Sequence, residues 1–293
     1  MRSRFLTRRP ELLFAALALA VGGCGESGEG GSFSAPDRVI AGPQGLVGQF
    51  VVECQLSHRA TDDPIVHPGH AGASHLHQFF GAIGVSVDTT YREMLVSGTT
   101  CDQQADTASY WAPVLVDSNQ EPIEPIRSVA YYRAGPGVEP TSVVPYPPGL
   151  MLIAGDAHAV EPQELSLVAW SCGTGSKRAE TPIDCSGAPS LRMIVTFPDC
   201  WNGVDITSSD WVDPAARHAV YSAEGECPES HPVAIPQLQF AIDYPPVDPE
   251  GLALSSGDVL GGHADFWNAW DPDKLRNEVT RCIHSNLVCG ITG

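Results

Sequence analysis

Two short segments that lie far apart in the sequence carry side chains of the kind that bind transition metals. One residue separates His75 from His77 in the first segment, and one residue separates His263 from Asp265 in the second. Because alternate residues of an extended strand point to the same face, each segment is expected to present two ligands on one side. Together they suit a zinc or copper site, or a water molecule held by histidines. In the alternative interpretation, His263 and Asp265 hydrogen-bond each other and the histidines are structural.

An aspartate just before the first histidine pair completes the set of candidate catalytic residues, which are Asp63, His75, His77, His263 and Asp265. The candidate metal ligands among them are His75, His77, His263 and Asp265. In a catalytic site, the histidines would hold a metal ion that activates water or oxygen, and a nearby aspartate would act as base. The sequence has no G-x-S-x-G, P-loop or H-E-x-x-H motif, which argues against elbow-type serine esterases, nucleotide enzymes and thermolysin-like proteases.

Short strands must position these residues, because runs rich in β-branched and aromatic side chains are bounded by Pro, Gly and Asp. The expected strands are residues 49–54, 128–132, 165–171, 191–197 and 237–242. The 25 prolines argue against long helices, and one short helix is expected near the C-terminus, with Asp271 as N-cap and Pro272 at its first position. The sequence therefore predicts a mainly β fold: an antiparallel, jelly-roll-like β-sandwich with long loops, a short C-terminal helix and about four disulfides.

Nine cysteines indicate an oxidising compartment. None lies in a C-x-x-C arrangement of the kind that binds zinc or exchanges electrons. If Cys24 carries a lipid, the other eight can pair completely. Spacing alone does not fix the connectivity, but short loops favour three pairs and leave the fourth by elimination: Cys172–Cys185, Cys200–Cys227, Cys282–Cys289 and Cys54–Cys101.

The N-terminus resembles a bacterial lipoprotein signal. Four arginines precede an apolar stretch of about ten residues, 12–21, which is too short to span a bilayer. The run Val21-Gly22-Gly23-Cys24 resembles the site at which such signals are cut and the cysteine is lipidated, whereas Ala18-Leu19-Ala20 would fit ordinary cleavage. The expected parts are a signal peptide (1–23), a lipidated Cys24 with a flexible tether (24–36) and a single β-rich domain (37–293). The protein would be anchored at the extracellular face of the cell envelope, or else be secreted or periplasmic.

The net charge of −19 limits the classes of molecule that the protein is expected to bind. Without residues 1–23, which include four arginines and one glutamate, the charge becomes about −22. Nucleic acid is therefore not expected as a partner. Contact with a membrane is expected through lipidated Cys24 only, and the oligomeric state stays open.

A series of motifs extends over most of the chain. It includes Asp63-Pro64-Ile65-Val66, Ser74-His75-Leu76-His77, Tyr110-Trp111-Ala112-Pro113, Phe197-Pro198-Asp199-Cys200-Trp201-Asn202-Gly203 and His263-Ala264-Asp265-Phe266. In this order, over about residues 45–285, the series resembles the secreted family catalogued as domain of unknown function number 1996. The resemblance implies an extracellular domain with motif histidines at His75, His77, His231 and His263, and it implies no established activity. Asp210-Trp211 stands where that family usually has an aspartate–histidine pair.

The leading hypothesis is a cell-surface protein that acts on or binds extracellular polysaccharide through a cleft between the two histidine segments. Tryptophan and tyrosine side chains would either line this cleft or fill the core. If the protein is an enzyme, it would be a metal-dependent hydrolase or oxidase with Cu or Zn as cofactor. The alternatives are a non-enzymatic surface binding module with structural histidines, and a metal-scavenging lipoprotein.

Overall fold

The computed structural model of the protein describes residues 40–41 and 48–290. All of them belong to a unit that spans Phe33–Gly293. The expected signal peptide (1–23) and the expected lipidated Cys24 with its tether (24–36) lie outside the described residues. In the part of the chain that is described, no helix combines the length and the apolar character needed to cross a bilayer.

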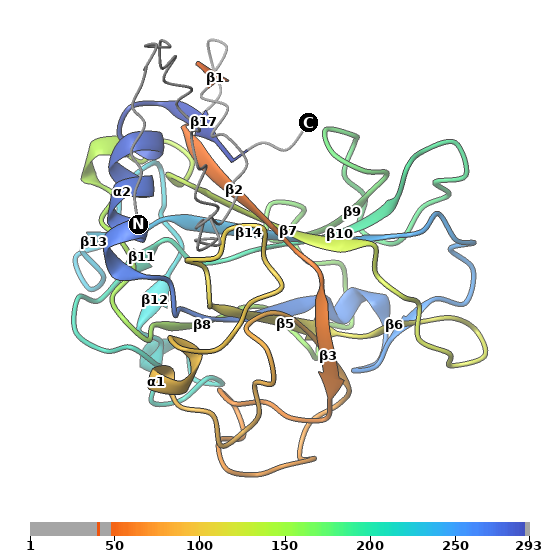
Figure 1. Ribbon diagram of the computed structural model, residues 1–293. Helices are drawn as coiled ribbons and strands as arrows, with labels where there is room; N and C mark the ends of the chain where they lie inside the picture. The colour runs from red at the N-terminus through yellow and green to blue at the C-terminus, as the bar shows by residue number, and fades with distance from the viewer. Residues whose placement is uncertain (1–39, 42–47, 291–293) are drawn as a thin grey trace, which may run out of the picture. The chain divides into compact units, whose positions relative to one another are not determined.

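Two large sheets form the fold, and Figure 1 shows β7, β14 and β10 in one layer and β5 and β8 in the other. The seven-stranded sheet has the order β1 (Ile40–Ala41), β17 (Leu287–Cys289), β2 (Gln49–Cys54), β7 (Arg127–Arg133), β14 (Gln237–Tyr244), β10 (Leu191–Thr196), β9 (Val168–Ser171). The five-stranded sheet has the order β3 (Leu56–Ala60), β4 (His77–Gly81), β5 (Ser109–Pro113), β16 (His263–Trp267), β8 (Met151–Gly155). Neighbouring strands are antiparallel except β17 and β2, which are parallel.

Smaller elements complete the described chain. Two minor sheets contain β12 (Ala219–Val220), β11 (Cys200–Trp201) and β13 (Val233–Ala234), and β15 (Ala253–Leu254) with β6 (Leu115–Val116). The helical segments are α1 (Tyr91–Met94), α2 (Pro272–Glu278), η1 (Pro140–Ser142), η2 (Pro214–Ala216), η3 (Val259–Gly261) and the π-helical η4 (Val279–Ile283). The mainly β, antiparallel sandwich with a short C-terminal helix is thereby confirmed.

The main core lies between the two large sheets, because alternate residues of each strand point inward. Ala130 and Tyr132 of β7 and Phe80 of β4 belong to this cluster, as do Ala264 and Phe266 of β16. Burying aromatic side chains of this size accounts for much of the stability of such a sandwich. The even-numbered residues of β4 and β16 therefore face the other sheet.

A second apolar cluster, here called the outer core, covers the opposite face of the five-stranded sheet. It contains Phe79, Trp111 and Trp267 from the strands, together with Ile65 and Met94 from segments that lie over them. Because both faces of β4 are covered, every residue of this strand is buried. Odd-numbered residues of β4 and β16, including the candidate ligands, therefore point toward the layer of loops and not toward the main core.

Several local expectations can be compared directly. All four expected disulfides form: Cys54–Cys101, Cys172–Cys185, Cys200–Cys227 and Cys282–Cys289. The C-terminal helix begins as expected, with Asp271 accepting hydrogen bonds from the backbone N–H groups of Asp273 and Lys274. The strand expected at 165–171 begins only at Val168, because the N–H groups of Leu167 and Val168 both donate to the carbonyl of Glu164 and close a turn there.

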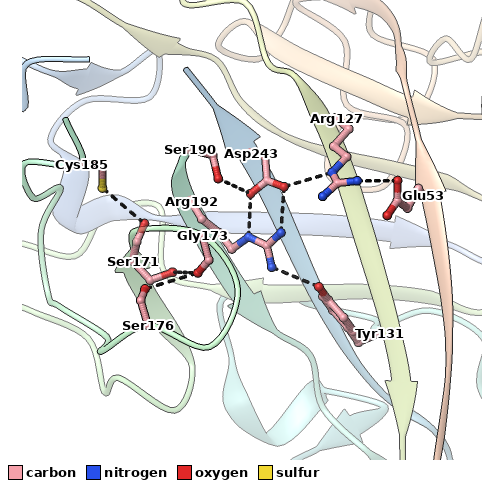
Figure 2. A network of polar contacts seen from close by, with 10 residues as sticks. All are labelled: Glu53, Arg127, Tyr131, Ser171, Gly173, Ser176, Cys185, Ser190, Arg192 and Asp243. Atoms are coloured by element: carbon pink, nitrogen blue, oxygen red, sulfur yellow. Dashed lines mark hydrogen bonds and ion pairs between the residues drawn. The ribbon is translucent and has the colours of Figure 1, made fainter. Parts of the chain in front are cut away.

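A network of ion pairs centred on the buried Arg192 and Asp243 lies on the outer face of the seven-stranded sheet, since its residues alternate with the core residues of their strands. Figure 2 shows the contacts. Arg192 donates to both carboxylate oxygens of Asp243, at 2.6 and 2.7 Å. Arg127 joins Asp243 at 3.2 Å to Glu53 at 2.7 Å. Burial raises the pKa of Asp243, but the hydrogen bonds and charges of Arg192 and Arg127 outweigh it and lower the pKa overall. The network therefore keeps Asp243 ionised between two cations.

Candidate metal centre

Two strands that are not neighbours carry the candidate ligands. β5 separates β4 from β16, and in its register Pro113 lies opposite His77 while Trp111 lies opposite Asp265. Continuing this register places His263 at the level of Pro113. One row across the sheet thus runs from His77 to His263, with a proline and not a long side chain between the two imidazoles. The two histidines can therefore approach a common point above the sheet.

His75 reaches the same point from the segment just before β4. Its ring centroid lies 4.2 Å from that of His77 and 5.0 Å from that of His263. One ring nitrogen of each of the three histidines lies within 4.8 Å of the others. His77 and His263 are buried and His75 is half-buried, so His75 forms the side of the cluster that is nearer to solvent. The two remote histidine segments therefore converge.

Backbone carbonyl groups fix the orientation of the two buried imidazoles. Nδ1 of His77 lies 2.9 Å from the carbonyl oxygen of Asp62, and Nδ1 of His263 lies 2.8 Å from that of Gly261. A carbonyl can only accept, so each Nδ1 carries the proton and each Nε2 presents a lone pair. Metal-binding histidines are oriented in this way, by hydrogen bonds from the nitrogen that does not bind the metal.

The ring nitrogens that face the cluster have too few hydrogen-bond donors around them. Nε2 of His77 is buried without a hydrogen-bond partner, and Nε2 of His263 lies 3.1 Å from Nε2 of His75. Two nitrogens that bind one ion at about 2.0–2.1 Å, at tetrahedral or right angles, lie about 3 Å apart. A buried acceptor without a donor costs on the order of 1–3 kcal/mol. A cation bound by all three imidazoles would satisfy these nitrogens.

Two buried carboxyl groups stand beside the imidazoles. Oxygens of Asp63 and Asp265 and a ring nitrogen of His77 all lie within 4.8 Å of one another. Oδ1 of Asp63 accepts hydrogen bonds from the N–H groups of Ile65 and Val66, at 3.0 and 2.9 Å. Oδ2 of Asp265 is buried without a partner. Oδ2 of Asp265 therefore does not accept the hydrogen bond from His263 that the alternative interpretation requires. Nδ1 of His263 donates to the carbonyl oxygen of Gly261 instead.

The pKa values of these groups favour neutral forms. Burial, followed by the charges of the neighbouring histidines, lowers the pKa of His75 to about 3. Burial lowers the pKa of His77 to about 4, against the opposing effect of its hydrogen bond to Asp62. Burial, followed by the nearby charge of Asp63, raises the pKa of Asp265 well above its ordinary value. Burial also lowers the pKa of His263, so all three imidazoles are neutral at ordinary pH, as a metal ion requires of histidine ligands.

The low pKa of His77 predicts that the metal-free protein loses stability in acid. The folded imidazole resists protonation down to about pH 4, whereas the unfolded one takes up a proton below its ordinary pKa of 6.5. Stability therefore falls as the pH falls through this window, by up to about 3 kcal/mol from this residue alone. Urea unfolding of chelator-treated protein at pH 7 and pH 4.5 measures the loss, which should be smaller in His77→Gln. An equal loss in both proteins would contradict this origin.

Gly155 of β8 supports the position of His263, with which it pairs in the sheet. Its φ is +82°, and an added Cβ would lie 2.3 Å from the carbonyl oxygen of Gly262 and 2.8 Å from Cα of His263. Gly84 has a similar φ of +74° with no atom within 4 Å of an added Cβ. Gly155→Ala should therefore cost about 1–3 kcal/mol of unfolding free energy more than Gly84→Ala. Equal costs in denaturant titrations would show that the backbone beside His263 is not tightly packed.

Most of the remaining histidines have partners elsewhere. His231, which the family resemblance added to the motif histidines, bonds to Arg217 and Ser230 and does not join the cluster. His67 and His158 lie close enough to His75 for their charges to lower its pKa. Sequence alone did not connect them to the site, because His67 lies beside Pro68 in a loop and His158 is far from both histidine segments in the sequence. The carbonyls of Asp62 and Gly261 were also missed, since backbone acceptors leave no residue-type signal.

The expected aromatic cleft is not formed by the largest side chains. Trp111, Trp270 and Tyr110 are almost completely buried, so they fill the core, which was the second of the two expectations for the aromatic side chains. A pocket of about 330 Å³ lies between Ile83 and Ser97 and has none of the five candidate residues in its lining. The candidate centre is therefore a buried cluster that opens on the side of His75.

Comparison with known proteins gives one match. The model of a family described as "Domain of unknown function (DUF1996)" matches residues 63–270, a range that includes all five candidate residues. No curated protein matches the chain, and no solved structure does.

Proposed function

The chain belongs to the DUF1996 family, whose description names no function, and we propose from the site itself that this domain binds one transition-metal ion, Zn²⁺ or Cu²⁺. The observation that carries the proposal is the convergence of one ring nitrogen from each of three histidines, together with an Nε2 of His77 that is buried with no partner. Imidazole nitrogens suit zinc and copper, whereas calcium and magnesium prefer sets of oxygen ligands. His75, His77 and His263 would hold the ion.

The two carboxyl groups have different parts in this proposal. Asp265 is buried beside His77, and its raised pKa favours the protonated carboxyl in the metal-free protein, so binding of the ion would displace this proton and let an oxygen complete the ligand set. Asp63 is held by two backbone N–H groups, so its carboxylate is fixed in place. A bound ion of this kind would supply Lewis acidity or, as copper, redox chemistry. The half-buried His75 marks the side from which a water molecule or substrate would approach.

Metal titration of the chelator-treated protein tests the proposal. Zn²⁺ or Cu²⁺ should bind with a stoichiometry of one ion per chain, and Ca²⁺ or Mg²⁺ at the same concentration should not compete. Elemental analysis after gel filtration gives the stoichiometry. If neither transition metal remains bound at one equivalent, the proposal is wrong.

Action on extracellular polysaccharide, or binding to it, stays a prediction. It can be tested with the metal-loaded protein. Cell-wall and plant glycans are incubated with loaded and chelator-treated protein, with and without reductant. Cleavage by the loaded protein alone indicates a metal-dependent hydrolase or oxidase, and binding without cleavage indicates a surface binding module. Tight metal binding with no response to glycans indicates a metal-scavenging lipoprotein. Lipidation of Cys24 is tested separately, by the mass of the mature N-terminal peptide in wild type and Cys24→Ser.

A further inference from the structure

Two arginines form a pair on the outer face of the seven-stranded sheet, on the other side of the sandwich from the candidate metal centre. Arg133 is on β7, and Arg178 lies in the loop closed by the Cys172–Cys185 disulfide. Both guanidinium groups converge on the side chain of Gln239 in β14. Its amide oxygen accepts from Nη2 of Arg133 at 3.1 Å and from Nη2 of Arg178 at 2.6 Å.

The pair lacks a negative partner. Among the residues that the structure describes, no carboxylate forms an ion pair with Arg133 or Arg178, whereas Arg127 and Arg192 on the same face are neutralised by Glu53 and Asp243 (Figure 2). Burial, and then the charge of Arg178, lower the pKa of Arg133. The chain has a net charge of −19, so carboxylates are far more numerous than cations. These two adjacent cations nevertheless share a neutral amide oxygen and no carboxylate.

Both arginines are held by rigid elements. Nη1 of Arg178 donates to the carbonyl oxygen of Leu165 at 2.7 Å, and the next residue, Ala179, exchanges two 2.8 Å backbone hydrogen bonds with Trp170. Gln239 lies in a central strand, paired on one side with Tyr131 and on the other with Thr196. The guanidinium groups are therefore positioned before any ligand arrives, which reduces the entropy that binding must overcome.

The chemistry of the pair identifies the class of ligand. Both side chains are half-buried, so part of their hydration is already lost and their charges act more strongly than at an open surface. Each guanidinium has five N–H donors arranged for two parallel hydrogen bonds to an oxyanion. We propose that Arg133 and Arg178 form a binding site for a small oxyanion or carboxylate group, independent of the metal centre. The group could be free sulfate or phosphate, or the carboxylate of an acidic sugar.

The test uses the whole domain and separates these sources. Sulfate, phosphate and glucuronate are titrated by calorimetry at constant ionic strength, which chloride maintains, into wild type, Arg133→Gln, Arg178→Gln and Arg92→Gln. Arg92 is an exposed arginine on α1, so the last variant makes the same change of charge away from the site.

At least one of the three anions should bind wild type saturably, and the one that binds identifies the source. Each of the two site variants should weaken that binding about tenfold or more, whereas Arg92→Gln should leave it unchanged. The site is refuted if no anion binds saturably, or if the site variants and the control behave alike.

Discussion

His77→Ala and His263→Ala should each lower the affinity for Zn²⁺ or Cu²⁺ by at least about 100-fold. Loss of a residue that only orients a ligand already costs 10–100-fold in metal affinity, so loss of a ligand should cost at least as much. Both imidazoles present Nε2 to the cluster because their Nδ1 atoms bond to backbone carbonyls. Competition titration with a chromophoric chelator measures the change.

The matched control is His231→Ala. His231 belongs to the motif histidines that the family resemblance implied, but its ring nitrogens bond to Arg217 and Ser230. This variant should keep the affinity of wild type. Circular dichroism of each metal-free variant checks that it is folded. If His231→Ala loses the metal and His77→Ala retains it, the ligands have been assigned to the wrong histidines.

Asp243→Ala should destabilise the protein by about 3–5 kcal/mol, because it leaves the buried charge of Arg192 without its partner. The Arg192 and Asp243 side chains are only 4% and 3% exposed, and Ser190 and Arg127 also bond to the carboxylate. Urea unfolding monitored by tryptophan fluorescence gives the change in unfolding free energy.

An exposed ion pair provides the comparison for this network. Arg276 and Asp273 pair at the start of α2 with side chains 63% and 90% exposed, so Arg276→Ala should cost less than about 1 kcal/mol. A similarly small cost for Asp243→Ala would mean that water replaces the carboxylate, and that the network does not stabilise the sheet.

Local sequence patterns were enough to predict much of the sandwich. The runs that became β2, β7, β10 and β14 are rich in β-branched or aromatic residues, and their alternation survives as inward and outward faces. The helix at Asp271 follows from capping chemistry that operates within four residues. The turn that shortens β9 could not be predicted, since it depends on which carbonyl the Leu167 and Val168 N–H groups find.

The candidate centre was predictable in its residues but not in its architecture. The spacing of His75 with His77 and of His263 with Asp265 indicated two strands with ligands on one face. The structure brings these residues together with Asp63, although β4 begins only at His77 and His75 lies just before it. The insertion of β5 between β4 and β16 depends on long-range pairing, which no local pattern encodes. The pairing of Arg133 with Arg178 could not be predicted from local patterns either. It forms because the loop closed by the Cys172–Cys185 disulfide brings Arg178 to the sheet.

The three-histidine metal site can be tested by the anomalous diffraction of a zinc-loaded crystal, measured at energies above and below the zinc absorption edge. One strong peak per chain is expected, about 2.0–2.1 Å from Nε2 of each of His75, His77 and His263. A peak bound only by carboxylates elsewhere, or no peak in a protein that has been given one equivalent of zinc, would contradict this expectation.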